Sequence, residues 1–171
     1  MQSGVNFFIF TKTFIMKNVF FAFLLFVGIN GVNAQTESLK WYDDISIASE
    51  KAFKENKPML LFFTGSDWCG WCHRLQKEVF FTTSFKEWAE KEVILVELDF
   101  PQKKVLPQNI KDQNATLQQQ FAVRGYPTIW FVNITKEDKN YNLQPLNQTG
   151  YLAGGPEVWI ANANSILGGG K

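Results

Sequence analysis

Residues 59–72 read Met-Leu-Leu-Phe-Phe-Thr-Gly-Ser-Asp-Trp-Cys-Gly-Trp-Cys, which joins an apolar run, a turn and a pair of cysteines. Five consecutive apolar residues at 59–63 are typical of a central strand that is covered on both faces. Residues 64–67 have the composition of a turn, and a helix is expected from about Cys69, with Cys72 on its apolar face. The sequence therefore places both cysteines where a buried strand gives way to a helix.

The spacing of the two cysteines has direct chemical consequences. Residues three apart in the first turn of a helix lie about 5–6 Å from each other, a separation that a disulfide can bridge. Cys69 lies where unpaired backbone N–H groups and the helix dipole favour a negative charge, so its thiol should ionise more easily than a free cysteine. Cys72 lies one turn further and is shielded. We therefore expect Cys69 to be the attacking thiolate and Cys72 to be the resolving thiol.

The rest of the chain alternates between strands and helices. Alternation that ends in a strand pair predicts an α/β fold with a central mixed β-sheet and helices on both faces. Hydrophobic residues make up 46% of the chain, enough for one well-filled core. We assign four tryptophans to this core or its rim, namely Trp41, Trp88, Trp130 and Trp159. The patterns predict helices at 43–57, from about 69 to 80, at 84–92, 115–123 and from 156 onward, strands at 59–63, 93–98, 128–132 and 148–153, and loops at 99–114 and 133–146.

Two motifs together resemble the thioredoxin-like superfamily, namely residues 68–72 and Gly-Tyr-Pro-Thr at 125–128. The resemblance covers roughly residues 41–167 and implies a thioredoxin fold. The stretch 57–72 is especially similar to the exported, periplasmic reductases that include the C-terminal domain of DsbD. The family places a cis-proline opposite the cysteine pair, which implies a cis bond at Tyr126-Pro127. It also implies that substrates bind through Trp68, Gly70, Trp71, Tyr126 and Pro127, with the two tryptophans forming an apolar rim around Cys69.

The sequence departs from thioredoxin in several places. The dipeptide between the cysteines is Gly-Trp rather than Gly-Pro, so the reduction potential of thioredoxin does not carry over. Phe63 occupies the position of a buried aspartate that assists proton transfer. Glu97 on the next strand is a candidate to substitute for this aspartate, but we favour the interpretation of Glu97 as a solvent-facing carboxylate. The spacing from Cys69 to Pro127 is longer than in thioredoxin, and we interpret the loop at 99–114 as a plain surface insertion rather than a partner-recognition surface.

The N-terminus has the pattern of a signal peptide. Lys12 and Lys17 precede an apolar run at 19–27, and Val-Asn-Ala at 32–34 resembles a cleavage site for residues 1–34. Met16 is an alternative start of the chain. The run is shorter than the roughly 20 residues that cross a bilayer, which favours cleavage over an uncleaved membrane anchor. We therefore expect a thioredoxin-like domain at 35–171 in the periplasm or secreted, with no stable membrane anchor after cleavage.

Charge and ligand counts limit the other function classes. The net charge of +1 does not favour binding to nucleic acid. Residues 69–73 match the Cys-x-x-Cys-His pattern of haem attachment, but His73 is the only histidine and Met59 lies within a buried strand. A zinc site formed by the two cysteines and His73 would lack a fourth ligand. We therefore expect no cofactor and no metal.

The sequence predicts an exported thiol–disulfide oxidoreductase, and we favour the reductase direction. Its partners would be protein thiols or disulfides together with an unidentified redox partner. Two alternatives remain open. One is a thioredoxin-fold binding module with a static disulfide, and the less favoured one is covalent haem attachment.

Overall fold

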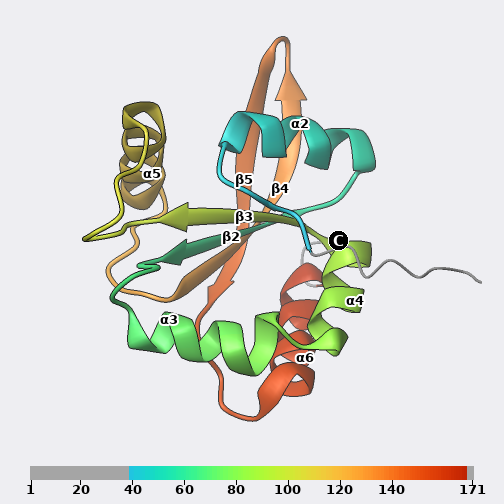
Figure 1. Cartoon of the computed structure of the whole chain (residues 1–171). Helices are drawn as coiled ribbons and strands as arrows, with labels where there is room; N and C mark the ends of the chain where they lie inside the picture. The colour runs from blue at the N-terminus through green and yellow to red at the C-terminus, as the bar shows by residue number, and fades with distance from the viewer. Residues whose placement is uncertain (1–38, 169–171) are drawn as a thin grey trace, which may run out of the picture. The chain divides into compact units, whose positions relative to one another are not determined.

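The computed structural model describes residues 39–168, in which a five-stranded mixed sheet carries helices on both faces (Figure 1). The strands lie in the order β1-β3-β2-β4-β5. β1 and β2 are parallel to β3, whereas β4 is antiparallel to both β2 and β5. The predicted thioredoxin fold is therefore confirmed. The strand bounds are β1 (Trp41–Tyr42), β2 (Met59–Thr64), β3 (Ile94–Asp99), β4 (Thr128–Glu137) and β5 (Asn140–Thr149).

The helices form two layers, one on each side of the sheet (Figure 1). α3, the π-helical segment η1, α4 and α6 pack on one face, and α2 and α5 pack on the other. None of the helices within residues 39–168 is long and apolar enough to cross a membrane. The predicted signal peptide at 1–34 lies outside the described residues. The helix bounds are α2 (Ile45–Glu55), α3 (Gly70–Leu75), η1 (Gln76–Phe80), α4 (Thr83–Glu92), α5 (Gln108–Gln120) and α6 (Gly155–Gly168).

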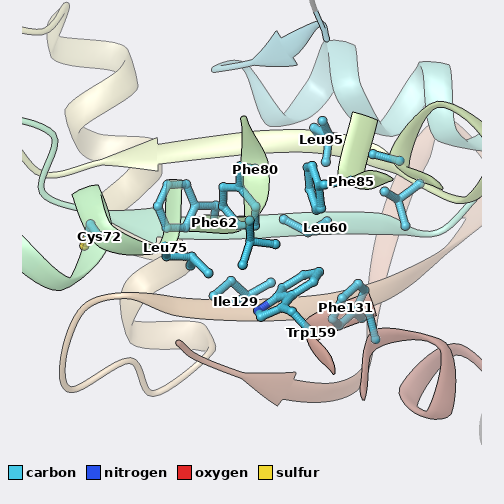
Figure 2. Close-up of a cluster of buried hydrophobic side chains, with 14 of the residues drawn as sticks. Leu60, Phe62, Cys72, Leu75, Phe80, Phe85, Leu95, Ile129, Phe131 and Trp159 are labelled. Atoms are coloured by element: carbon cyan, nitrogen blue, oxygen red, sulfur yellow. The ribbon is translucent and has the colours of Figure 1, made fainter. Parts of the chain in front are cut away.

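β2 is the centre of both cores, as its unbroken apolar sequence predicts. Leu60 and Phe62 face the layer of α3, whereas Leu61 and Phe63 face the layer of α2, and all four are fully buried. Figure 2 shows the first of these clusters, in which the side chains of Phe62, Phe80, Phe85, Phe131 and Trp159 lie together against the sheet. The Trp159 indole donates to the carbonyl of Gly150 at 3.0 Å. This packing joins α6 to η1, α4 and β4.

Two of the predicted loops are wrong. Helix α5 begins at Gln108, directly after Pro107, because Ile110, Asn114 and Leu117 give it a buried face at helical spacing. Residues 133–146 are a β-hairpin rather than a polar connection, since β4 continues to Glu137 and β5 starts at Asn140. The tip of the hairpin is exposed, so its strands carry polar residues and lack the alternation that marks a half-buried strand.

The tryptophans lie where the composition predicts. Trp159 is fully buried, and Trp41, Trp88 and Trp130 are half-buried at the edges of the two cores. Trp88 donates from its indole to the side chain of Asn164 at 2.8 Å, which links α4 to α6. Aromatic residues therefore join the helices of one layer to one another as well as to the sheet.

Candidate active site

Cys69 and Cys72 form a disulfide at the start of α3, with their Cα atoms 5.2 Å apart. Cys69 is the N-cap residue, and its sulfur accepts a hydrogen bond from the backbone N–H of Cys72 at 3.2 Å. Cys69 is 5% exposed and Cys72 is 0% exposed. Because a helix N-terminus stabilises negative charge, a thiolate is favoured at Cys69. The more exposed cysteine of the pair is thus also the one whose ionisation the backbone supports.

The turn before the pair is closed by Gly65 and covered by Trp68. The carbonyl of Gly65 accepts the N–H groups of Trp68 and Cys69 at 3.2 and 2.9 Å. A Cβ atom at Gly65 would lie less than 3.0 Å from three atoms of the Trp68 indole, so only glycine leaves room for this ring. The Trp68 indole N–H donates to the carbonyl of Phe100 at 2.8 Å, while the ring remains 42% exposed. Trp68 is therefore held as a fixed apolar surface beside Cys69.

The Tyr126-Pro127 peptide bond is cis, in agreement with the prediction. It directly precedes β4, whose first residue Thr128 pairs with Phe63 near the end of β2. The Tyr126 ring meets the Trp68 ring edge-on at 5.6 Å, and its hydroxyl accepts from the Gln118 amide at 2.6 Å. Partial burial raises the pKa of the Tyr126 hydroxyl. The fold therefore brings Tyr126 and Trp68 together across 58 residues of sequence.

Trp71 lies between the two cysteines in the sequence and belongs to a group that we name the Trp71 cluster, which contains Trp71, Arg74, Glu78 and Tyr151. The Trp71 and Tyr151 rings lie 5.3 Å apart, and the Arg74 guanidinium lies 5.4 and 5.1 Å from them. Glu78 accepts from Arg74 Nε at 2.8 Å and from the Tyr151 hydroxyl at 2.5 Å, and the bond from Tyr151 lowers the pKa of the Glu78 carboxyl. Trp71 is 56% exposed, so the cluster supports an indole that faces solvent. Nothing in the sequence pattern marked Tyr151 as part of the site.

Gly70 is exposed, and the space into which a side chain would extend is open. A Cβ atom there would meet no heavy atom within 4 Å. The neighbours of Gly70 therefore do not require a glycine at this position.

Glu97 is half-buried rather than solvent-facing, which corrects the interpretation that we favoured from the sequence. It pairs in register with Phe62, so its side chain lies on the same face of the sheet as the cysteine pair. Burial raises the pKa of the Glu97 carboxyl, and the nearby charge of Asp99 adds to this. Phe63, at the position of the family's aspartate, faces the opposite cluster.

Two carboxylates tie the active-site turn to the segment that follows β3. Asp99 accepts from the backbone N–H and the hydroxyl of Ser66 at 2.8 and 2.6 Å. Asp67 accepts the backbone N–H groups of residues 102–104 at 2.9, 2.7 and 3.0 Å, and these donors lower the pKa of its carboxyl, the Gln102 N–H most strongly. The segment is exposed at residues 102–105, as a surface insertion would be, and it is also bonded to the turn that carries the cysteines.

The residues that haem attachment or a metal site would use are Cys69, Cys72 and His73, all at the start of α3. His73 is exposed, as expected, and its Nε2 lies 2.7 Å from the carbonyl oxygen of Ser66. Both sulfurs that haem attachment would use are bonded to each other. Within residues 39–168 no group of three or more His, Cys, Asp or Glu side chains is arranged to hold a metal ion.

The aromatic side chains next to Cys69 are exposed, since Trp68 and Trp71 are 42% and 56% exposed. Neither cysteine lines the cavities of about 870, 770 and 260 Å³ on the described part of the protein. The predicted substrate-contact residues Trp68, Trp71 and Tyr126 do not line them either. A partner that reaches Cys69 would therefore meet an open face with aromatic side chains, which suits a peptide better than a small enclosed molecule.

Residues 46–140 match the family model of the thioredoxin-like domain. The chain belongs to the thioredoxin-like family. This thioredoxin-like protein is 34% identical over 130 residues to the disulfide bond reductase DsbH of Chlamydia pneumoniae, an alignment that covers 76% of this chain and 74% of that protein. It is 27% identical to the thioredoxin-related protein DsbJ of the same organism, of whose length it spans only 39%.

A solved structure titled DsbH Oxidoreductase superposes with a TM-score of 0.68 at 32% identity, covering 76% of this chain and 85% of that one. The predicted family is therefore confirmed, and the relatives named in these comparisons are DsbH and DsbJ rather than DsbD. Family membership together with the Cys69–Cys72 pair identifies the thioredoxin-like protein as a protein-disulfide oxidoreductase.

Proposed function

We propose that this protein is an exported reductase of protein disulfides, in which Cys69 attacks the substrate and Cys72 resolves the mixed disulfide. One observation carries the assignment of these roles. Cys69 caps a helix and accepts the N–H of Cys72, whereas Cys72 is fully buried behind it. A stabilised and accessible thiolate is the better attacking group, and a shielded thiol is the better resolving group.

The reaction is a transfer of two electrons from the dithiol form of the protein. The Cys69 thiolate attacks one sulfur of the substrate disulfide, so that a mixed disulfide forms and the other substrate sulfur leaves as a thiolate. The Cys72 thiol loses its proton and attacks the Cys69 sulfur, which forms the Cys69–Cys72 disulfide and releases the second substrate thiolate. The protein is oxidised and the substrate is reduced, and the two released thiolates take up protons. A dithiol donor then restores the reduced pair.

The exposed aromatic rings around Cys69 support binding of an extended substrate. Trp68 and Trp71 flank the cysteines and expose large apolar surfaces, and Tyr126 lies against Trp68. We propose that a peptide lies across these rings and pairs with the backbone at Tyr126, beside Pro127. The open space above Gly70 leaves room for the substrate sulfur.

The direction of transfer and the location are proposals that rest on resemblance. The relative DsbH is named a disulfide bond reductase, and it aligns with three quarters of this chain. Export rests on the signal-peptide pattern at residues 1–34.

The test is the reduction of insulin by the mature chain, residues 35–171, with dithiothreitol as the donor. The native protein should accelerate precipitation of the insulin B chain, and Cys69→Ser should abolish the acceleration. Cys72→Ser should instead accumulate a mixed disulfide with insulin that is visible on a non-reducing gel. Equal rates for the native protein and Cys69→Ser would refute catalysis.

The reduction potential of the Cys69–Cys72 pair distinguishes a reductase from a protein with a static disulfide. Equilibration against a glutathione series gives the reduction potential, and a reductase should lie near the low end of the family range, about −270 mV. A potential well below about −300 mV, with no insulin reduction, would instead establish the static binding module.

A further inference from the structure

The segment that joins β5 to α6 lies against both the cis-proline turn and α3 (Figure 1). A Cβ atom at Gly150 would lie 3.4 Å from the carbonyl oxygen of Pro127, so the two backbones are in close contact. The next residue, Tyr151, places its ring 5.3 Å from the ring of Trp71 in α3. Because the Gly150 carbonyl accepts from the fully buried indole of Trp159 at 3.0 Å, the core holds the segment in this position.

Contacts of this segment complete a continuous path that starts and ends at the cysteine pair. On one side, Trp68 precedes Cys69 and its ring meets the Tyr126 ring at 5.6 Å. On the other side, Trp71 lies between the two cysteines in the sequence and its ring meets the Tyr151 ring. The two sides join where the residue after Tyr126 contacts the residue before Tyr151. Tyr151 is therefore part of the aromatic surface beside the disulfide, although it comes from the last loop of the fold.

The orientation of the Trp71 indole depends on this distant residue. Trp71 is 56% exposed, and within residues 39–168 the ring of Tyr151 is the only aromatic ring that pairs with it. The Arg74 guanidinium lies 5.4 Å from the Trp71 ring and 5.1 Å from the Tyr151 ring. Glu78 accepts hydrogen bonds from both Arg74 and Tyr151, which fixes the two groups that contact the indole. The Trp71 side chain is thus held from outside the core, by side chains that Glu78 joins.

We propose that Tyr151 is a positioning residue, which holds the Trp71 indole ready for a substrate whose reacting cysteine is flanked by an apolar side chain. The proposal rests on the reductase function above and adds a substrate class to it. A fixed indole binds an apolar side chain without a further loss of rotamer freedom, whereas an indole without support loses that freedom on binding. A peptide with Leu beside its disulfide should therefore react about three- to tenfold faster than one with Gly, and the preference should depend on Tyr151.

The experiment measures the reduction of two synthetic peptides, which contain the same disulfide flanked by Leu or by Gly. The dithiol form of the mature chain is mixed with each peptide, and quenching by alkylation gives the second-order rate constant for formation of the active-site disulfide. Tyr151→Ala and the conservative Tyr151→Phe are compared with Tyr141→Ala as the matched control. Tyr141 is also half-buried and has similar partners, since its ring lies 5.8 Å from Phe53 of α2 and 5.3 Å from the Lys136 ammonium, but α2 covers the opposite face of the sheet.

The ratio of the rate constants for the Leu and Gly peptides is the readout. Support requires a ratio of three or more in the native protein and in Tyr141→Ala, and a ratio near one in Tyr151→Ala with the rate for the Gly peptide unchanged. Tyr151→Phe keeps the ring beside Trp71 and loses only the bond to Glu78, so it should retain part of the preference. In the background of Trp71→Ala, which itself removes the preference, Tyr151→Ala should have no further effect, because Tyr151 acts through the indole.

A ratio near one in the native protein, an equal loss in Tyr151→Ala and Tyr141→Ala, or an unchanged ratio in Tyr151→Ala would overturn the proposal. An equal fall in the rates for both peptides in Tyr151→Ala would also overturn it, since that result indicates damage to the cysteine pair rather than to the apolar surface. The Gly peptide tests the reductase function separately. If the native protein reduced neither peptide, the reductase function would fail, whereas if it reduced both at equal rates, only the role of Tyr151 would fail.

Discussion

Substitution of Gly65 by alanine should displace Trp68 from the active-site surface. The backbone at Gly65 does not have positive φ, so alanine fits the chain there without strain. Its Cβ would nevertheless lie less than 3.0 Å from the Trp68 indole, and the ring would have to move. Movement breaks the hydrogen bond from the indole to Phe100 and the edge contact with Tyr126.

The cost follows from these two contacts. A net hydrogen bond contributes about 0.5–1.5 kcal/mol, and an aromatic pair contributes about as much. Because Trp68 is 42% exposed, we take the lower half of the sum, about 1–2 kcal/mol. Gly70→Ala is the matched control, since its Cβ meets no atom within 4 Å and alanine favours a helix over glycine by up to about 1 kcal/mol. Gly70→Ala should therefore be neutral or stabilising.

The assay is urea unfolding of the oxidised protein, followed by circular dichroism, with unchanged slopes required for comparison. A double-mutant cycle isolates the clash, because Gly65→Ala should cost less than about 0.5 kcal/mol once Trp68 is already alanine. If Gly65→Ala were neutral in the native background, or equally costly without the indole, the packing argument would be wrong.

Two further substitutions test the carboxylates by the pH dependence of stability. Burial raises the pKa of the Glu97 carboxyl above its usual value of 4.5. The free energy of unfolding should therefore fall as the pH rises above 4.5, and Glu97→Gln should be more stable than the native chain at pH 7 but not at pH 4. Urea unfolding at the two pH values measures this, and no gain at pH 7 would contradict it. Backbone donors lower the pKa of Asp67, so its contribution should be present above pH 3.8 and lost as pH falls further. Asp67→Asn should therefore destabilise the chain at pH 7 more than at pH 3 and accelerate hydrogen exchange at the amides of residues 102–104, and unchanged exchange there would argue against the tether.

Local sequence signals were sufficient for the centre of the fold. The apolar run of β2 needs burial on both faces, and the turn and cysteine pair after it require a helix start, so these elements follow from neighbouring residues alone. The cis bond at Tyr126-Pro127 came from the family resemblance, because no local pattern distinguishes it from a trans bond.

The errors concern features that depend on partners distant in the sequence. The hairpin of β4 and β5 is stabilised by pairing between its own strands, and its exposed end has no apolar alternation to reveal it. Asp67 binds backbone N–H groups about 35 residues away, and backbone donors leave no trace in a pattern of side chains. The same is true of Glu97, whose burial is set by neighbours on other strands and loops rather than by its own strand.

The burial of Cys72 has a consequence for both halves of the proposed cycle. In the oxidised protein a dithiol donor has access only to the sulfur of Cys69, since Cys72 is 0% exposed. Reduction of the substrate and recharging by the donor therefore use the same sulfur and the same aromatic surface. Donor and substrate must then compete for this surface.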